Sequence, residues 1–182
     1  MTRSVTDRVR HLASYFALGP TRRMITVGLV IFLIDQITKR MVLFALGFGQ
    51  EWVLLEGFFK LVHWGNTGAA WNLFYGNNRI LAIIALAALT ALFLSRHHFD
   101  IHRVTGQVAL GLISGGILGN LTDRLVVNHV IDFLYFYMIR KNGEELGFPA
   151  FNVADAAICS GVALIFYQSF NGKETLSSAV KK

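Results

Sequence analysis

Long apolar runs, separated by segments rich in aromatic and basic residues, set the pattern of this chain. A helix needs about 20 apolar residues to cross the ~30 Å hydrocarbon core of a bilayer. The pattern predicts four membrane spans, at 24–46, 80–94, 104–125 and 153–170. The second span is short, and Leu73, Phe74 and Tyr75 are candidates to extend it. We therefore expect an all-α polytopic membrane protein that forms a four-transmembrane-helix bundle.

Basic residues predict which side of the membrane each connecting segment faces. Ten lysines and arginines lie in the segments 1–23, 95–103 and 171–182, whereas the segments 47–79 and 126–152 together hold four. Segments rich in lysine and arginine stay on the cytoplasmic side. We expect a cytoplasmic N-terminal extension at 1–23, a four-span catalytic membrane domain at 24–170 and a cytoplasmic tail at 171–182.

Both outward-facing segments are dense in aromatic residues, which suit the headgroup layer of a membrane. These residues are Trp52, Phe58, Phe59, Trp64, Trp71, Phe74 and Tyr75 in the first segment, and Phe133, Tyr135, Phe136, Tyr137 and Phe148 in the second. The pattern predicts strands at 58–64 and 133–139, the second followed by a turn at 141–143. We expect a small, outward-facing amphipathic β element lying on the outer leaflet.

Composition and charge narrow the classes of function. Only 15% of the 182 residues are charged, against about a quarter in soluble domains. The net charge of +6 is spread over the ends of apolar runs, which is typical of membrane proteins and not of nucleic-acid binding. The single Cys159 excludes an internal disulfide, and the cluster of His97, His98 and His102 lacks other ligands at metal spacing. We therefore expect no metal and no cofactor.

Ionisable residues within the apolar runs are costly and normally face the protein interior. Asp35 and Lys39 are four residues apart, so they share a helix face and can pair. At ~1.5 Å per residue, Asp35 lies roughly 17 Å along the first span and Asp123 and Arg124 about 29–30 Å along the third. All of these groups fall in the outer half of the bilayer, where a bundle would bring them together.

Asp132 and Asp155 are the candidate catalytic pair. Asp155 lies in the first turn of the last span, and Asp132 lies in the preceding outer loop between apolar neighbours. Two neighbouring carboxylates share a proton, so that one can activate water while the other protonates a scissile amide. A helix N-terminus favours an anion at Asp155, and desolvation favours the acid form of Asp132. We expect Asp155 to act first as the base and Asp132 as the proton donor.

Each candidate also has a structural interpretation. The alternatives are a helix cap for Asn152 with Asp155, a solvated loop acid for Asp132, an interface ion pair for Asp123 with Arg124, and a structural ion pair for Asp35 with Lys39. Gly111, Gly115 and Gly119 form a stripe of small residues that predicts close helix packing.

Two other functions are compatible with the same residues. A small transporter or proton pathway would also place ionisable residues inside spans. The charges here gather near one surface, however, and the sequence has no inverted repeat with a midplane site. A non-catalytic membrane scaffold is the third interpretation, and it predicts that Asp132→Asn and Asp155→Asn leave function intact.

Five motifs identify a family when they are taken together in this order. They are Asp35-Gln36-Ile37-Thr38-Lys39, Asn66-Thr67-Gly68-Ala69-Ala70-Trp71, Gly115-Gly116-Ile117-Leu118-Gly119-Asn120-Leu121-Thr122-Asp123-Arg124, Val130-Ile131-Asp132-Phe133 and Phe151-Asn152-Val153-Ala154-Asp155. The chain resembles bacterial lipoprotein signal peptidase, also called signal peptidase II, over roughly residues 24–170.

The resemblance implies an aspartic endopeptidase of the bacterial inner membrane, with Asp132 and Asp155 as its catalytic pair. Such an enzyme removes the signal peptide of a prolipoprotein, cutting before a cysteine that carries a diacylglyceryl group, and is inhibited by globomycin. The positions implied to shape the site or bind substrate are Asp35, Lys39, Asn66, Gly68, Asn120, Asp123, Arg124, Asn152 and Ala154. Membrane lipid and prolipoproteins are the implied partners, and nothing in the sequence requires more than a monomer.

Overall fold

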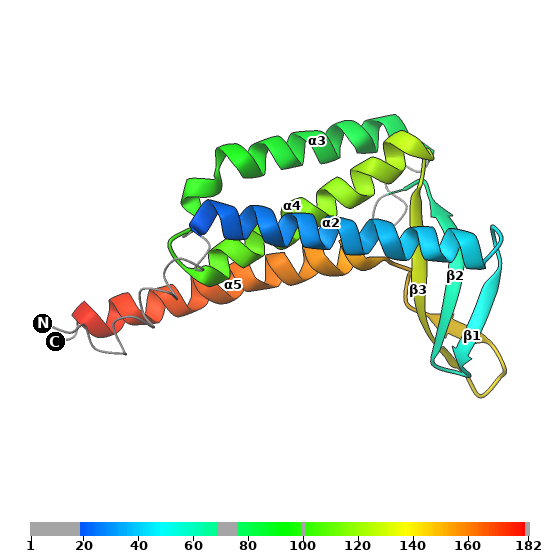
Figure 1. Cartoon of the computed structure of the whole chain (residues 1–182). Coiled ribbons are helices and arrows are strands. Elements are labelled where there is room, and N and C mark those ends of the chain that lie inside the picture. Colours follow the sequence, from blue (N-terminus) through cyan, green and yellow to red (C-terminus); the bar gives the residue numbers. More distant parts are fainter. Residues whose placement is uncertain (1–18, 69–75, 100, 181–182) are drawn as a thin grey trace, which may run out of the picture.

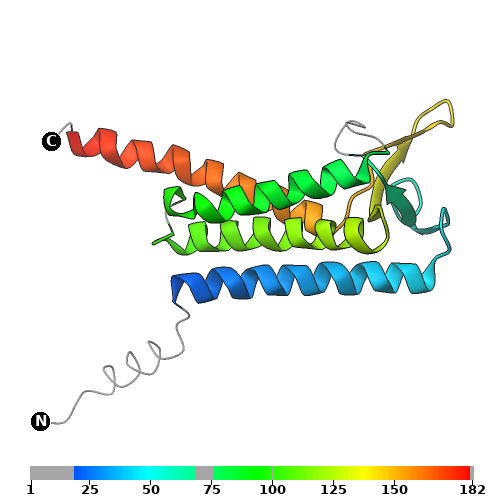
Figure 2. The same ribbon diagram turned by 90° about the horizontal axis from the view of Figure 1, so that it is seen from above.

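The computed structural model describes residues 19–68, 76–99 and 101–180, with side chains described as far as residue 170. The described elements are α2 (Pro20–Ala45), β1 (Glu51–Leu55), β2 (Phe59–Asn66), α3 (Asn78–Leu94), the short 3-10 helix η2 (Arg96–His98), α4 (Val104–Val126), β3 (Val130–Ile139), β4 (Glu145–Gly147) and α5 (Val153–Val180). The long helices lie side by side, and the sheet stands at one end of them (Figures 1 and 2). The start of α2 and the end of α5 lie at the opposite end.

The four helices coincide with the four predicted spans, but they differ in membrane-spanning character. By length and composition, α4 and residues 153–170 of α5 qualify as candidate spans, while α3 is a shorter apolar helix. The structure therefore shows apolar helices with a small sheet, and the number of membrane spans stays a prediction. The last helix also continues beyond Phe170 to Val180, so that part of the expected tail is helical.

Small residues place α4 at the centre of the bundle, where it packs against both α2 and α5. A Cβ added at Gly115 would lie 2.5 Å from the carbonyl oxygen of Gly28 in α2. A Cβ added at Gly116 would lie 2.5 Å from the carbonyl oxygen of Ala154 in α5. The predicted role of the glycine stripe in helix packing is confirmed, because no larger side chain fits between these backbones.

The variant Gly116→Ala is expected to lower thermal stability, because its methyl group meets backbone atoms that cannot rotate away. Overpacking of this kind costs about 1–3 kcal/mol, and each kcal/mol lowers Tm by about 2–4 °C for a chain of this size. Thermal unfolding in detergent measures the change. Gly19→Ala is the matched control, since nothing lies within 4 Å of the added atom. An unchanged Tm for Gly116→Ala would contradict this packing.

The sheet has the strand order β1-β2-β3-β4, with antiparallel neighbours throughout. The strands β2 and β3 confirm the two predicted strands. However, β3 begins at Val130, so Asp132 lies within a strand and not in the loop where we expected it. The sequence analysis missed β1 and β4. The apolar run of β1 lacks alternation and every residue in it is exposed, and β4 has only three residues.

Buried contacts fix the sheet internally and against the helices. Lys60 of β2 is 4% exposed and forms ion pairs with Glu51 of β1 at 2.8 Å and with Glu145 of β4 at 2.9 Å. Phe133 of β3 packs into a buried cluster with Val42 and Leu46 from the end of α2. The strand that carries Asp132 is therefore held at a defined position over the helix ends.

Candidate active site

Asn152 and Asp155 form a reciprocal cap at the start of α5. The backbone N–H of Asp155 donates to Oδ1 of Asn152 at 2.9 Å, and the backbone N–H of Asn152 donates to Oδ2 of Asp155 at 3.2 Å. Such a capping box satisfies two backbone donors that a helix start would otherwise leave unpaired. The capping interpretation is confirmed, and the cap also holds the Asp155 carboxylate in one orientation.

Asp132 is buried between two asparagine side chains. Its carboxylate accepts a hydrogen bond from Nδ2 of Asn66 in β2 at 2.9 Å and another from Nδ2 of Asn152 at 2.8 Å. The residue is 3% exposed. The alternative that Asp132 is a solvated loop acid is therefore wrong, because the first four residues of β3, Asp132 among them, are buried.

Asn120 and Asn152 join the two acids in one network. Nδ2 of Asn120 donates to Oδ1 of Asp155 at 2.7 Å, and Nδ2 of Asn152 approaches Oδ1 of Asn120 at 3.2 Å. Asn152 thus contacts both acids, Asp132 through its side chain and Asp155 through its backbone N–H. The candidate pair is brought together by residues from α4, β3 and the start of α5.

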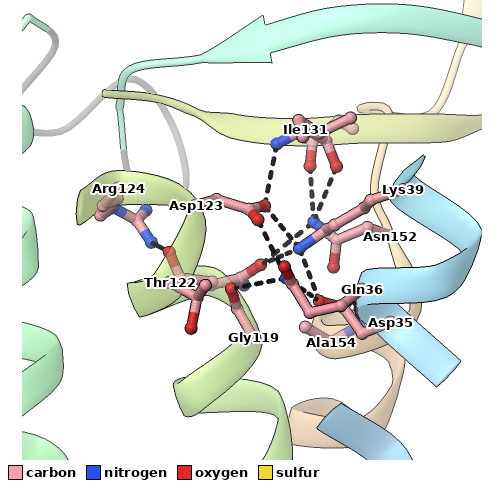
Figure 3. A network of polar contacts seen from close by, with 12 residues as sticks. Asp35, Gln36, Lys39, Gly119, Thr122, Asp123, Arg124, Ile131, Asn152 and Ala154 are labelled. Carbon is pink, nitrogen blue, oxygen red and sulfur yellow. Dashed lines mark hydrogen bonds and ion pairs between the residues drawn. The ribbon is translucent and has the colours of Figure 1, made fainter. Parts of the chain in front are cut away.

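Lys39 is the buried cation on which the neighbouring acids converge. Its Nζ lies 2.8 Å from Asp35 and 2.7 Å from Asp123, and it also donates to Oδ1 of Asn120 at 3.0 Å. The predicted pair of Asp35 with Lys39 is confirmed. In this structure Asp123 pairs with Lys39, so the expected pair of Asp123 with Arg124 is wrong. Figure 3 shows Lys39 and Asp123 beneath the strand of Ile131, with Asp35 and Asn152 beside them.

This ion cluster also holds the backbone around the candidate pair. Oδ1 of Asp35 accepts a hydrogen bond from the backbone N–H of Ala154 at 2.9 Å, one residue before Asp155. Oδ2 of Asp123 accepts one from the backbone N–H of Ile131 at 3.3 Å, one residue before Asp132. Each structural acid therefore anchors the neighbour of a candidate catalytic acid.

The sequence analysis missed Gln36 and Asn78 as contributors to the site. Nε2 of Gln36 donates to Oδ1 of Asp123 at 3.0 Å and approaches the carbonyl oxygen of Gly119 at 3.3 Å. Nδ2 of Asn78 donates to the carbonyl oxygen of Arg124 at 2.8 Å. The signal for Gln36 was its position beside Asp35 in an apolar run, whereas the contact of Asn78 depends on tertiary packing.

Arg124 lies in the last turn of α4, beside the site, and one of its N–H donors is unpaired among the described residues. Its Nη1 lies 3.4 Å from the carbonyl oxygen of Asn120, and its buried Nε has no hydrogen-bond partner among the described residues. Gly68 is buried, and its backbone N–H donates to Oδ1 of Asn66 at 2.9 Å. The rest of that motif, residues 69–71, lies outside the described residues, as does the expected helix extension at 73–75.

The electrostatic environment of Asp132 favours its protonated form. Burial, together with the nearby charge of Asp155, raises the pKa of Asp132 to about 7. The hydrogen bonds from Asn66 and Asn152 and the charge of Lys39 act in the opposite direction, since they stabilise the carboxylate. Near neutral pH, a substantial fraction of Asp132 therefore carries a proton. When one acid of a pair is protonated and the other is a carboxylate, the first can donate a proton and the second can accept one in the same reaction.

The sequence and structure of this chain are similar to those of known proteins. The model of the family described as Signal peptidase (SPase) II matches residues 27–171. The chain is 37% identical to a lipoprotein signal peptidase of Symbiobacterium thermophilum and 34% identical to that of Bacillus subtilis, each over 143 residues. These matches cover 78% of this chain, and 90% and 89% of the two relatives. A bacterial membrane enzyme solved by the in meso method at 2.3 Å is 29% identical, with a TM-score of 0.67, over 84% of this chain and 90% of that one.

Proposed function

The chain belongs to the signal peptidase II family, and we propose that Asp132 and Asp155 are the catalytic dyad of this membrane peptidase. The enzyme removes signal peptides from prolipoproteins. Its membership of a peptidase family decides against the transporter and scaffold interpretations. The dyad proposal is supported by one observation above all, which is that Asn152 hydrogen-bonds both carboxylates.

We propose that cleavage occurs at the outer surface of the bacterial inner membrane, before a diacylglyceryl-modified cysteine. A signal peptide is a short apolar helix whose cleavage point emerges at that surface. In this arrangement 24–170 is the four-span catalytic domain, both termini are cytoplasmic, and the sheet lies on the outer leaflet. Globomycin would inhibit by occupying the site, and a monomer suffices because one chain supplies both acids.

The proposed mechanism starts with Asp155 as carboxylate and Asp132 as acid. Asp155 removes a proton from a water molecule, which attacks the carbonyl carbon of the scissile amide. Asp132 gives its proton to the leaving nitrogen as the tetrahedral intermediate breaks down. The two acids have then exchanged protonation states, and proton transfer between them restores the start.

Neighbouring donors complete the proposed site. The unpaired Nε of Arg124 is suited to donate to a substrate carbonyl oxygen, since a buried donor without a partner gains most from a ligand acceptor. Asn66, Asn120 and Asn152 hold the two acids in place. Lys39, with Asp35 and Asp123, fixes the backbone on either side of the dyad.

The pH dependence of cleavage tests the proposed role of Asp132. Because Asp132 must carry the proton to be donated, kcat/KM is expected to fall as pH rises through about 7. Asn66→Ala removes a hydrogen bond that stabilises the carboxylate form. The pKa of Asp132 should therefore rise in this variant, and the alkaline limb of the profile should move to higher pH.

The measurement is the rate of prolipoprotein cleavage by purified protein in detergent from pH 5 to 9. Asn142→Ala is the matched control, because that asparagine is exposed and its side chain hydrogen-bonds the turn residue Glu144. A rate that keeps rising above pH 8, or an alkaline limb at the same pH in Asn66→Ala, would argue against Asp132 as the acid.

A further inference from the structure

An apolar groove lies between α2, α3 and α4 at the end of the bundle away from the sheet. It has a volume of about 380 Å³. Its lining residues are Met24, Leu89, Thr90, Leu92, Phe93, Arg96, Leu110 and Ser114. α2 and α3 each pack against α4, and residues of all three helices line the groove.

The groove continues along α4 as a second hollow of about 390 Å³, which shares Met24 and Ser114 with the first. On α4 the combined floor is the stripe Leu110, Ser114, Leu118 and Thr122. Twelve residues of helix rise about 18 Å, which is more than half of the ~30 Å hydrocarbon core. The groove therefore has the reach of an acyl chain in one leaflet.

This groove is on the other side of α4 from the proposed active site. Successive helix residues turn by about 100°, so Leu118 and Asn120 point in nearly opposite directions. Asn120 faces Asp155 of α5, whereas Leu118 lines the second hollow together with residues of α2. A substrate whose cleavage point reaches Asp155 has no need of this groove.

One arginine lines the groove, and further arginines lie at the same end of the bundle. Arg96 lines the groove and is exposed; its guanidinium lies 4.3 Å from the ring centroid of Phe93, and its Nη1 donates a long hydrogen bond of 3.5 Å to the carbonyl oxygen of Phe93. Arg22, Arg23 and Arg103 lie at the same end of the bundle. Among the described residues of 19–34, 76–99 and 101–122 there is no aspartate or glutamate; Asp100 falls between these ranges, and Asp7 and Glu174 lie in the two terminal segments of the sequence.

We propose that this groove is a binding site for an acidic phospholipid of the cytoplasmic leaflet. Its acyl chain would lie along the α4 stripe, and its phosphate would meet Arg96 at the mouth. Basic pockets between membrane helices on the cytoplasmic side typically bind such headgroups. A signal-peptide helix is the poorer occupant, because its own cationic n-region would lie against the arginines. The inference rests on the proposed membrane orientation, but not on the catalytic dyad.

Native mass spectrometry of the whole purified protein tests the site. The probes are phosphatidylglycerol and phosphatidylcholine with identical acyl chains, so that only the headgroup charge differs. Wild type is expected to retain one phosphatidylglycerol in preference to phosphatidylcholine. Arg96→Gln should weaken phosphatidylglycerol binding about fivefold, the effect of one basic residue at an anionic headgroup, and leave phosphatidylcholine binding unchanged. Thr90→Trp should weaken binding of both lipids by filling the groove.

Two matched controls make the result decisive. Arg22→Gln removes an exposed arginine that does not line the groove, and Ala91→Trp places the same bulk on an exposed position beside Thr90 but outside it. Equal retention of both lipids by wild type would overturn the proposal. So would an equal loss in Arg22→Gln and Arg96→Gln, which indicates diffuse attraction, or displacement of the lipid by a synthetic signal peptide. Prolipoprotein cleavage in lipid-free detergent should be unchanged in Arg96→Gln, which separates this test from that of the dyad.

Discussion

Asp132→Asn and Asp155→Asn are each expected to reduce kcat for prolipoprotein cleavage by at least about 10³-fold. Each acid carries out a proton transfer, and a positioned general acid or base contributes about 10²–10⁴-fold. An asparagine keeps the shape of the side chain but neither accepts the proton of water nor supplies one to the leaving nitrogen. The double variant should be no slower than the worse single variant, because the two acids act as a unit.

Cleavage of a prolipoprotein by purified protein in detergent, followed by gel shift, measures this effect. Glu56→Gln is the matched control, since it replaces an exposed acid in the turn between β1 and β2 by its amide. Thermal unfolding must show that each variant is folded. Near-normal cleavage by both folded variants would contradict the dyad and leave Asp155 as a helix cap alone.

The Asp132→Asn variant should also change how stability depends on pH. The pKa of Asp132 is about 7 in the folded protein, above the ~3.9 of an unfolded aspartate. A group with a raised pKa contributes its stability fully below the unfolded pKa and loses it as pH rises through the folded pKa. Asparagine does not titrate, so it carries no charge at any pH in this range. The Tm of the variant minus that of wild type should therefore increase from pH 5 to pH 8.

Local spacing made part of this site predictable. The four-residue separation of Asp35 and Lys39 places both on one helix face, and the spacing of Asn152 and Asp155 is that of a capping box. The stripe of glycines likewise predicted close helix contacts, which Gly115 makes. For the two pairs, both residues belong to one segment, so helix geometry alone sets their contact. For the glycines, the missing side chain is what allows a neighbouring helix to come close.

Contacts between distant segments could not be predicted in the same way. Asp123 has Arg124 as its sequence neighbour, yet it forms an ion pair with Lys39, because α2 packs against α4. The burial of Lys60 between two glutamates from β1 and β4 was not predictable from its neighbours in the sequence either. Which acid a buried cation meets depends on helix rotation and strand register, and neither is encoded locally.

Lys39→Met is expected to lower the free energy of unfolding by about 3–5 kcal/mol, the cost of leaving buried charges uncompensated. Lys39 is 1% exposed and lies within 2.8 Å of both Asp35 and Asp123. Methionine fills a similar volume, so the loss is electrostatic rather than a cavity effect. At about 2–4 °C per kcal/mol, the Tm in detergent should fall by roughly 10 °C. Arg40→Met is the matched control, because that neighbouring residue is exposed.

A second measurement distinguishes a role in the chemistry from a role in folding alone. The charge of Lys39 lowers the pKa of Asp132, so its removal should move the alkaline limb of the cleavage profile to higher pH. In the triple variant Asp35→Asn, Lys39→Met, Asp123→Asn no buried charge is left unpaired in this cluster, and stability should recover. If the limb stays at the wild-type pH in folded Lys39→Met, Lys39 acts only as a structural ion. If it moves up, the same lysine that joins α2 to α4 also sets the proton affinity of the dyad.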